Sequence, residues 1–306
     1  MKKTFMLLLS ILLIVILSAC GQQGGQAAEQ ASSAETGNAA ADGEPRIASL
    51  SIHLTNNLLA LGITPVGSVV GGELKTFLPH VADRLTDTKP LGTAADPDME
   101  TLLALKPDVI YVDEQLAGDI SRYEKIAKTQ VFNLDEGTWR DHLEQIGELV
   151  NREQEAEDFI KDNQAQAERV KKLIHDKIGD GTAMGVRVTA KELRVFGLRR
   201  PMGPMLFEDL GLKPASGVEK INRDKSYEVI SQEVLPDFNA DAIFVVVNNQ
   251  DGAKKLYEQL QDSPIWQGLK AVKANQVYMI PDQPWLDYSA LGNKMSLDQA
   301  EQMFLK

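Results

Sequence analysis

The chain has 306 residues, of which 44 are Asp or Glu and 32 are Lys or Arg, so its formal net charge is −12. This excess of negative charge argues against binding to nucleic acid and against lying flat on an anionic lipid surface. The single cysteine excludes an intrachain disulfide and any site built from several thiolates. The fold must therefore be stabilised by the packing of its core.

The first twenty residues have the pattern of a bacterial export signal that ends in a lipid attachment site. Lys2 and Lys3 precede an apolar run, residues 5–17, that is too short for a comfortable membrane span. The run ends in LSAC, which resembles a lipobox and predicts cleavage after residue 19 and diacylglycerol, with palmitate-type acyl chains, on Cys20. The alternatives are an uncleaved anchor helix and a chance cysteine after an ordinary signal peptide. Cleavage of the signal peptide, residues 1–19, removes two lysines and changes the net charge from −12 to −14.

A polar segment follows the cysteine. Residues 21–44 contain no aromatic side chain and, apart from alanine, no apolar one. Such a composition cannot bury enough surface to offset its ordering entropy, so we predict a flexible tether over residues 20–45. The long tether and Gly21, in place of Asp, favour a lipid-anchored protein on a Gram-positive cell surface over a periplasmic one.

From residue 46 onward, short strand-like runs alternate with helical patterns. In the first half the predicted strands are 46–50, 66–70, 108–113 and 130–134, and the predicted helices are 55–61, 97–104 and 117–127. In the second half the predicted strands are 241–247 and 276–280, followed by a final helix at 293–305. Apolar strands joined by helical crossovers predict parallel sheets covered on both faces. The fold class is therefore α/β, with two lobes that each have a central sheet.

The longest helical pattern lies between the two halves. Its apolar residues recur every three or four positions, its middle is mostly charged, and glycines follow it. We predict one long helix over 138–179 that joins an N-terminal lobe, 46–137, to a C-terminal lobe, 180–306. His142 and His175 lie on this helix and are expected to face solvent.

Three segments of the first half recur in the second half in the same order. LGITP, from Leu61, recurs as LGLKP, from Leu210. ETLLALKPDVIYV, from Glu100, recurs as EVLPDFNADAIFV, from Glu233. QVFNLDEGTWRD, from Gln130, recurs as QVYMIPDQPWLD, from Gln276. The last pair aligns Trp139, which we expect to pack in a core, with Trp285. Glu100 and Glu233 begin helices at equivalent places, although an acid in a first turn can also simply favour the helix dipole.

One segment is strongly basic. Between residues 184 and 203 there are five Lys or Arg residues and one acid, Glu192, which gives a net charge of +4. The alternation of apolar and charged residues predicts a hairpin that turns at 189–192 and places Arg187 opposite Arg194. Like charges directly across a ladder are destabilising, so an anion between them is one explanation and a solvated hairpin is the other. Arg199 and Arg200 follow the hairpin.

Loops supply further candidates for binding. Trp285 and Tyr288 lie between a strand and the last helix, where open α/β sheets bind ligands. Lys75 and Arg84 lie in a first-half loop and could add positive charge. His53 is a loop histidine of the same half.

No catalytic motif is present. The sequence has no G-x-S-x-G, no H-E-x-x-H, no phosphate-binding loop and no G-x-G-x-x-G after a strand. His53 and His80 are scattered histidines, which make a poor transition-metal site. We therefore predict neither an enzyme nor a metal site.

The succession of several segments resembles one protein family. These segments are RIASLSIHLTNNLLALGITPVG, LGTAADPDMETLLALKPDVIYV, PMGPMLFEDLGLKPA, YEVISQEVLPDFNADAIFVV and SPIWQGLKAVKANQVYMI. They are similar to the substrate-binding lipoproteins of iron–siderophore and cobalamin ABC importers. The resemblance implies a class III fold of two α/β lobes joined by one long helix, with a ligand cleft between the lobes.

The resemblance also implies roles for individual residues. Cleft arginines and aromatics would hold an anionic ferric siderophore, which makes the expected ligand residues Arg187, Arg194, Arg199, Arg200, Trp285, Tyr288, Lys75, Arg84 and His53. One glutamate per lobe, here Glu100 and Glu233, would dock on the two permease subunits, which work with a cytoplasmic ATPase. The siderophore itself would fill the coordination sphere of the iron, so no cofactor and no protein metal ligand is implied. A monomer is expected.

Other functions stay open at this point. A haem or cobalamin binder would share the fold, with Tyr288 or His53 as an axial ligand of haem. A sensor subunit would need the same cleft. An extracytoplasmic enzyme acting on a polyanion would use the same arginine cluster with Asp or Glu as acid and base, but no paired carboxylates stand out in the candidate loops, although Asp282 and Asp287 lie there. The kind of siderophore, whether catecholate, hydroxamate or carboxylate, does not follow from the sequence.

Overall fold

The computed structural model describes residues 44–72, 75–221 and 225–305. Within these ranges six strands form a first sheet, in the order β4-β3-β2-β1-β5-β6. The strands are β1 (Ile47–Ser49), β2 (Gly67–Val70), β3 (Lys89–Thr93), β4 (Asp96–Pro97), β5 (Val109–Asp113) and β6 (Lys128–Phe132). Only β3 and β4 pair antiparallel, so the parallel sheet predicted for this half is confirmed.

The second sheet is mixed. Its order is β10-β8-β7-β11-β12, and β9 also pairs with β7. The strands are β7 (Thr182–Val188), β8 (Leu193–Phe196), β9 (Lys213–Pro214), β10 (Tyr227–Ile230), β11 (Ala242–Val247) and β12 (Val277–Ile280). In this half β11 pairs parallel with β7 and β12, as the crossovers predicted, and β8 runs antiparallel to β7, as the predicted hairpin requires, while β10 adds a second antiparallel pair with β8. A tight turn between β7 and β8 can join only antiparallel strands.

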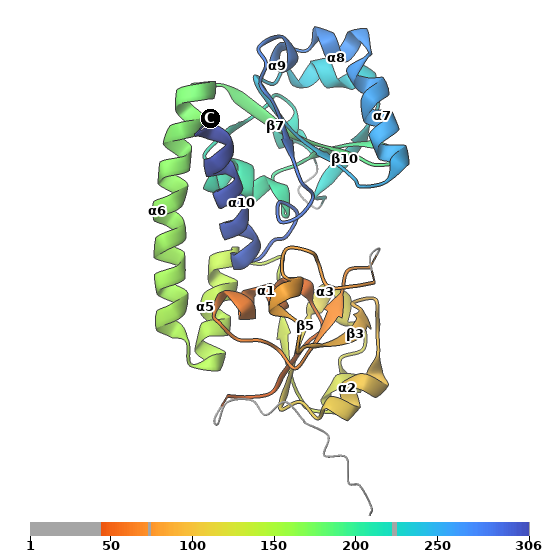
Figure 1. The fold of residues 1–306 in the computed structure, drawn as a ribbon, viewed down its shortest axis with the longest axis vertical. Helices are drawn as coiled ribbons and strands as arrows, with labels where there is room; N and C mark the ends of the chain where they lie inside the picture. The colour runs from red at the N-terminus through yellow and green to blue at the C-terminus, as the bar shows by residue number, and fades with distance from the viewer. Residues whose placement is uncertain (1–43, 73–74, 222–224, 306) are drawn as a thin grey trace, which may run out of the picture. The chain divides into compact units, whose positions relative to one another are not determined.

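Helices connect the strands of both sheets (Figure 1). The α-helices are α1 (Ile52–Ala60), α2 (Met99–Leu105), α3 (Glu114–Ala117), α4 (Ser121–Glu124), α5 (Trp139–Val150), α6 (Glu153–Ile178), α7 (Asp251–Gln261), α8 (Pro264–Gly268), α9 (Lys270–Lys273) and α10 (Ala290–Phe304). The shorter or irregular turns are η1 (Ala82–Arg84), η2 (Pro204–Asp209), η3 (Val218–Lys220) and η4 (Gln232–Phe238). The helix predicted at 117–127 is confirmed only over α4, because the chain leaves the helical conformation at Gly118, whose φ is 58°, and this separates α3 from α4.

The connection between the halves is two helices, so the single helix predicted over 138–179 is also wrong. Asn151 adopts a left-handed conformation with φ 55° and ends α5, and α6 begins two residues later. A Cβ atom at Gly147 would lie 3.0 Å from the Cβ of Ala156, so glycine permits α5 and α6 to pack closely at the break. The long connection is therefore α6, the green helix of Figure 1.

Helix α6 contributes to the cores of both halves. Ile160 packs in a core cluster with residues of the first sheet, whereas Val170 and Ile174 pack with residues of the second. Tyr288 and Ala290, at the start of α10, are buried in the cluster of the first half. The two halves thus share side chains at both α6 and α10, and they are joined by packing as well as by the chain.

The internal repeat predicted from the sequence has a structural equivalent in each half. Before β1, the backbone nitrogen of Arg46 donates to Asp108 Oδ2 at 2.7 Å. At the first residue of β7, the backbone nitrogen of Thr182 donates to Asp241 Oδ2 at 2.8 Å. In each half, the aspartate that precedes a central strand therefore fixes the start of the neighbouring strand: Asp108, before β5, does this for β1, and Asp241, before β11, does it for β7. Trp139 and Trp285 are likewise both buried, each at 1% exposure.

The predicted signal peptide, Cys20 and nearly all of the predicted tether lie outside the described residues. In the ranges that the structure does describe, every helix is too short or too polar to cross a bilayer.

Candidate functional site: an arginine cluster and two buried carboxylates

Two arginines lie side by side on the hairpin of the second sheet. Strands β7 and β8 pair with Arg187 opposite Arg194, and the backbone nitrogen of Thr189 donates to the carbonyl oxygen of Glu192 at 3.0 Å to close the turn. The hairpin and its facing arginines, predicted from the sequence, are confirmed. Like charges opposite each other weaken a strand pair, so neighbouring groups must compensate the two guanidinium groups.

Partners from the second half orient both guanidinium groups. Arg187 Nε donates to Asn248 Oδ1 at 2.8 Å. Arg194 Nε donates to Glu192 Oε1 at 2.6 Å, and its guanidinium lies 4.3 Å from the ring centroid of Tyr227. Arg194 keeps 25% of its side-chain surface exposed. The two planar cations are thus held in place and still reachable from solvent, as contact with an external anion requires.

Arg199 and Arg200 form a second basic pair, which a carboxylate from the first half contacts. Asp135, in the loop after β6, accepts from Arg199 Nη2 at 2.8 Å and from Arg200 Nε at 2.7 Å. Burial raises the pKa of Asp135, but the hydrogen bonds and charges of Arg200 and Arg199 outweigh it and lower that pKa below its usual value. The aspartate is therefore ionised at neutral pH.

Asp287 is a buried carboxylate where the halves meet. It accepts from His53 Nδ1 at 3.1 Å, from Asn56 Nδ2 at 2.7 Å, from His80 Nε2 at 3.1 Å and from Ser289 Oγ at 2.9 Å. Its side chain is 1% exposed. Three of its four donors belong to the first half, so this carboxylate holds the start of α10 against α1.

Asp209, at the end of η2, forms a second buried junction. Trp139 Nε1 donates to its Oδ2 at 3.3 Å, Asn293 Nδ2 donates to the same oxygen at 2.5 Å, and Arg140 forms an ion pair with it. These donors come from α5 and α10. Asp209 is 2% exposed, so the junction stabilises the packing of these elements and does not offer a surface for binding.

The two aromatic candidates are buried. Trp285 is 1% exposed, packs in the core of the second half and donates from Nε1 to Gln299 Oε1 at 2.8 Å. Tyr288 is 9% exposed, and burial, followed by the charge of Glu208, raises its pKa to about 12. The structure thus places both rings in cores, and we leave them out of the ligand site proposed below.

Three sequence candidates remain. His53 contacts Asp287, as described above. Lys75 and Arg84 are exposed, and neither forms an ion pair with another described residue. Of the nine predicted ligand residues, the structure brings together Arg187 with Arg194 and Arg199 with Arg200.

His142 and His175, on the helices that connect the two halves, were both predicted to face solvent, and the two predictions have different outcomes. His175 is exposed, as predicted. His142 is 4% exposed, so its prediction was wrong. Its Nε2 contacts the carbonyl oxygen of Glu136 at 2.7 Å, and burial lowers its pKa. The ring fills the turn between β6 and α5, a position that helical periodicity cannot reveal.

Sequence reasoning missed the partners of the arginines. Tyr227 and Asn248 hold Arg194 and Arg187, and Asp135 contacts Arg199 and Arg200. Tyr227 begins the edge strand β10, and its place there is only a weak sequence signal that it contacts an arginine. No local pattern pointed to Asp135, because it is 65 residues distant from Arg200 in the chain.

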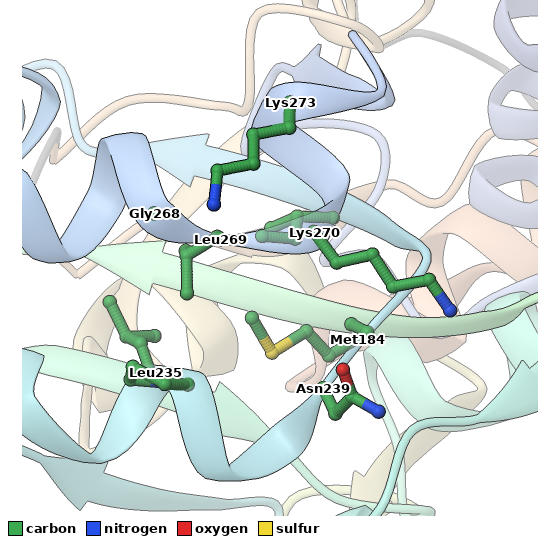
Figure 2. Close-up of a pocket in the computed structure, with 10 residues that line it drawn as sticks. Met184, Leu235, Asn239, Gly268, Leu269, Lys270 and Lys273 are labelled. Carbon is green, nitrogen blue, oxygen red and sulfur yellow. The ribbon is translucent and has the colours of Figure 1, made fainter.

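A hollow of about 430 Å³ lies elsewhere on the second half (Figure 2). Met184, Leu235, Ile243 and Leu269 supply its apolar lining, and Lys270 and Lys273 also line it. None of the predicted ligand residues lines this hollow, so it is separate from the arginine cluster.

Glu100 and Glu233 occupy equivalent exposed positions in the two halves. Asp98 caps α2 by accepting from the backbone nitrogen of Thr101 at 2.9 Å, and Glu100 lies in the first turn. Glu233 lies in the first turn of η4, where a hydrogen bond from Ser231 lowers its pKa. Both are exposed, so their carboxylates can reach a partner.

No group of three or more His, Cys, Asp or Glu side chains within the described ranges is arranged to hold a metal ion. The features that the structure does show are the oriented guanidinium groups of the hairpin and two α/β halves. Together they define a binding protein of two lobes bridged by a long helix.

A family model described as periplasmic binding protein matches residues 47–284. The chain belongs to the periplasmic binding protein family.

Individual relatives carry more specific names. The chain is 29% identical to the probable siderophore-binding lipoprotein YfiY of Bacillus subtilis over 100% of this chain and 99% of the relative. It is 25% identical to the Fe(3+)-citrate-binding protein YfmC of the same organism, over 84% of this chain and 80% of the relative. The crystal structure of Staphylococcus aureus SirA complexed with staphyloferrin B matches with a TM-score of 0.75 and 28% identity, covering 85% of this chain and 93% of SirA.

Proposed function

We propose that this chain is the extracytoplasmic substrate-binding subunit of an ABC importer and that it captures an anionic ferric siderophore for delivery to a membrane permease. The arginine cluster carries the proposal, because four arginines within fourteen positions, residues 187–200, include a facing pair held in place by second-half partners. The printed names of the relatives, which include siderophore and Fe(3+)-citrate binders, support the same class of ligand.

The chemistry of the cluster favours a chelate over a bare metal ion. Guanidinium groups repel cations and offer planar sets of N–H donors to carboxylate or catecholate oxygens. A siderophore that fills the coordination sphere of iron presents such oxygens at its surface. The protein would therefore contact the chelator, and no protein ligand to iron is needed.

Haem is less well supported by the arrangement. Its axial ligand was expected to be Tyr288 or His53. Tyr288 is buried in a core with its pKa raised to about 12, so it is not placed to accept a large planar ligand.

Replacement of Arg187 and Arg194 together by Ala should weaken binding of the ferric siderophore at least tenfold, which is about 1.4 kcal/mol. The reason is the loss of two oriented cations that contact the anionic oxygens. Fluorescence titration against a panel of ferric catecholates, ferric hydroxamates and ferric citrate measures the affinity.

The matched control replaces Lys254 and Lys255, which are exposed on α7, by Ala. It removes the same charge from the same half and should leave the affinity unchanged. Equal affinities for the wild type and the double arginine variant would contradict the proposed site.

The proposed anchor is tested separately. Protein extracted from membranes should have a mass larger than that of the cleaved polypeptide, because diacylglycerol and acyl chains are attached to Cys20. Mass spectrometry of the intact protein and of its N-terminal peptide measures this difference. A peptide with an unmodified thiol at Cys20 would rule out the lipid anchor.

A further inference from the structure

The hollow of about 430 Å³ on the second half has an apolar floor (Figure 2). Met184 of β7 and Ile243 of β11 lie opposite each other in the sheet. Leu235 of η4 and Leu269, between α8 and α9, complete the floor. All four side chains are at most 6% exposed and belong to one core cluster. Both the volume and the apolar lining are typical of sites that hold a small molecule.

Gly268, at the end of α8, lines the hollow and leaves space in it. A Cβ atom at this position would meet no heavy atom within 4 Å. The φ of Gly268 lies outside the left-handed region, and the residue is exposed. A larger side chain can therefore be placed here without backbone strain, and it would take up part of the hollow.

Two lysines of α9 also line the hollow, and their side chains run in different directions (Figure 2). Lys270 Nζ forms an ion pair with Asp241 Oδ1 at 2.5 Å. Lys273 forms no ion pair with any side chain of the described ranges. Asp237 and Asp241, the acids that directly follow lining residues in the sequence, are not part of the lining. Lys273 can therefore offer its ammonium group to a molecule in the hollow.

The hollow and the facing arginines of the hairpin lie on opposite faces of the second sheet. Successive residues of a strand point to alternate faces, and Met184 and Arg187 are three positions apart in β7. Arg187 shares its face with its neighbour Val246, which packs in the other core cluster of this half. A molecule in the hollow therefore does not contact the facing arginines.

We propose that this hollow is a second ligand site and that it takes a small amphipathic anion, with an alkyl or aryl body and one carboxylate. The apolar body packs on Met184, Leu235 and Leu269 and leaves water. The carboxylate accepts a charge-assisted hydrogen bond from Lys273 Nζ. The inference goes beyond the proposed function and does not rest on it, because the arginine cluster takes no part.

Both parts of the ligand are needed for selective binding. An anion without an apolar body leaves the floor uncovered and gains only a solvent-exposed charge contact, which contributes little. An uncharged molecule with the same body covers the floor but gives the ammonium group no anionic partner. The site therefore distinguishes an amphipathic anion from each of these.

The test is isothermal titration of the purified chain with decanoate, below the concentration at which it forms micelles, and with decanol and acetate. Decanoate should bind at least tenfold more tightly than acetate and about threefold to fivefold more tightly than decanol. Lys273→Met keeps a long side chain and removes its charge. This variant should therefore bind decanoate and decanol equally well.

Gly268→Leu fills part of the hollow and should weaken the binding of both decanoate and decanol at least tenfold. Lys254→Met is the matched control for charge, because Lys254 is exposed on α7 and does not line the hollow. It should bind decanoate as the wild type does. Circular dichroism and a thermal melt verify that the variants are folded.

The variant with Arg187 and Arg194 replaced by Ala locates the bound anion. It should bind decanoate as the wild type does, because these arginines lie on the other face of the sheet. Decanoate binding that is lost in this variant and kept in Gly268→Leu would place the anion on the arginine cluster and overturn the proposal. A wild type that does not bind decanoate, or a Lys273→Met variant that prefers decanoate to decanol as the wild type does, would overturn it as well.

Discussion

A chain with Glu100 and Glu233 both replaced by Arg should lose uptake of the ferric siderophore down to the background of cells that lack the protein. On the proposal that the two glutamates dock on the permease, each reversal would replace an attraction by a repulsion at a cost of about 2–5 kcal/mol, and both together would weaken docking by roughly a thousandfold or more. The affinity of the purified protein for the ligand should stay within about twofold, because the exposed glutamates lie outside the arginine cluster.

The surroundings of the two glutamates suit a protein partner. Leu103, one helical turn after Glu100, is 59% exposed, and Val234, next to Glu233, is 38% exposed. An exposed apolar side chain beside each carboxylate adds surface that a partner can bury. The equivalence of the two positions in the internal repeat also fits a partner made of two similar subunits.

The matched control for docking replaces Glu124 and Glu258 by Arg. Both are exposed, one lies in each half, and neither forms an ion pair with another described residue. The control changes the net charge by the same amount and should transport normally. Measurement of radioactive iron uptake in cells, together with ligand titration of the purified chains, separates docking from binding. Normal uptake by the Glu100 and Glu233 variant would reject the docking assignment.

Replacement of Asp287 by Ala should lower the free energy of unfolding by about 3–5 kcal/mol. The carboxylate is 1% exposed on its side chain and accepts four hydrogen bonds. Its removal leaves buried donors of Asn56 and His80 without an acceptor, and each such group costs roughly 1–3 kcal/mol. Unfolding in urea, followed by circular dichroism, measures the change.

Two further variants refine the test of Asp287. Asp287→Asn keeps an acceptor oxygen but loses the charge and should have intermediate stability. Asp262→Ala removes an exposed aspartate after α7 and should change the stability by less than about 0.5 kcal/mol. A loss below 1 kcal/mol in Asp287→Ala would mean that the buried cluster does not stabilise the fold.

Because of Asp287, the free energy of unfolding should depend on pH in the acid range. Burial raises the pKa of Asp287, but hydrogen bonds from His53 and His80 and their charges outweigh it and hold that pKa well below its usual value of 3.8. Because the folded pKa lies below the unfolded one, the stabilising contribution is complete above about 3.8 and is lost as the pH falls toward the folded value. The difference in unfolding free energy between wild type and Asp287→Asn should therefore shrink below pH 3.8 and be constant just above it.

Much of the fold was predictable because strands are short and their patterns are local. The predicted strands 46–50, 66–70, 108–113 and 241–247 correspond to β1, β2, β5 and β11. The connecting helix was predicted as one piece because apolar residues recur every three or four positions both before and after its charged middle. The break depends on a single left-handed residue, Asn151, which periodicity does not detect.

The sequence by itself determined the features that depend on neighbours in the chain. Arg187 and Arg194 face each other because a tight turn joins adjacent strands and fixes their register. Glu100 and Glu233 are equivalent because each half repeats the same order of helix and strand. These relations are set within a few residues, and local rules are sufficient to find them.

Only the tertiary structure decided which distant groups meet. Asp287 reaches His53 across 234 positions of sequence, and Asp135 reaches Arg200 across 65. Trp285, which the sequence placed in a binding loop, is turned into the core by the packing of α10 against α6 and the second sheet. Such contacts depend on how complete elements pack, so they follow from the folded chain and not from any single segment of it.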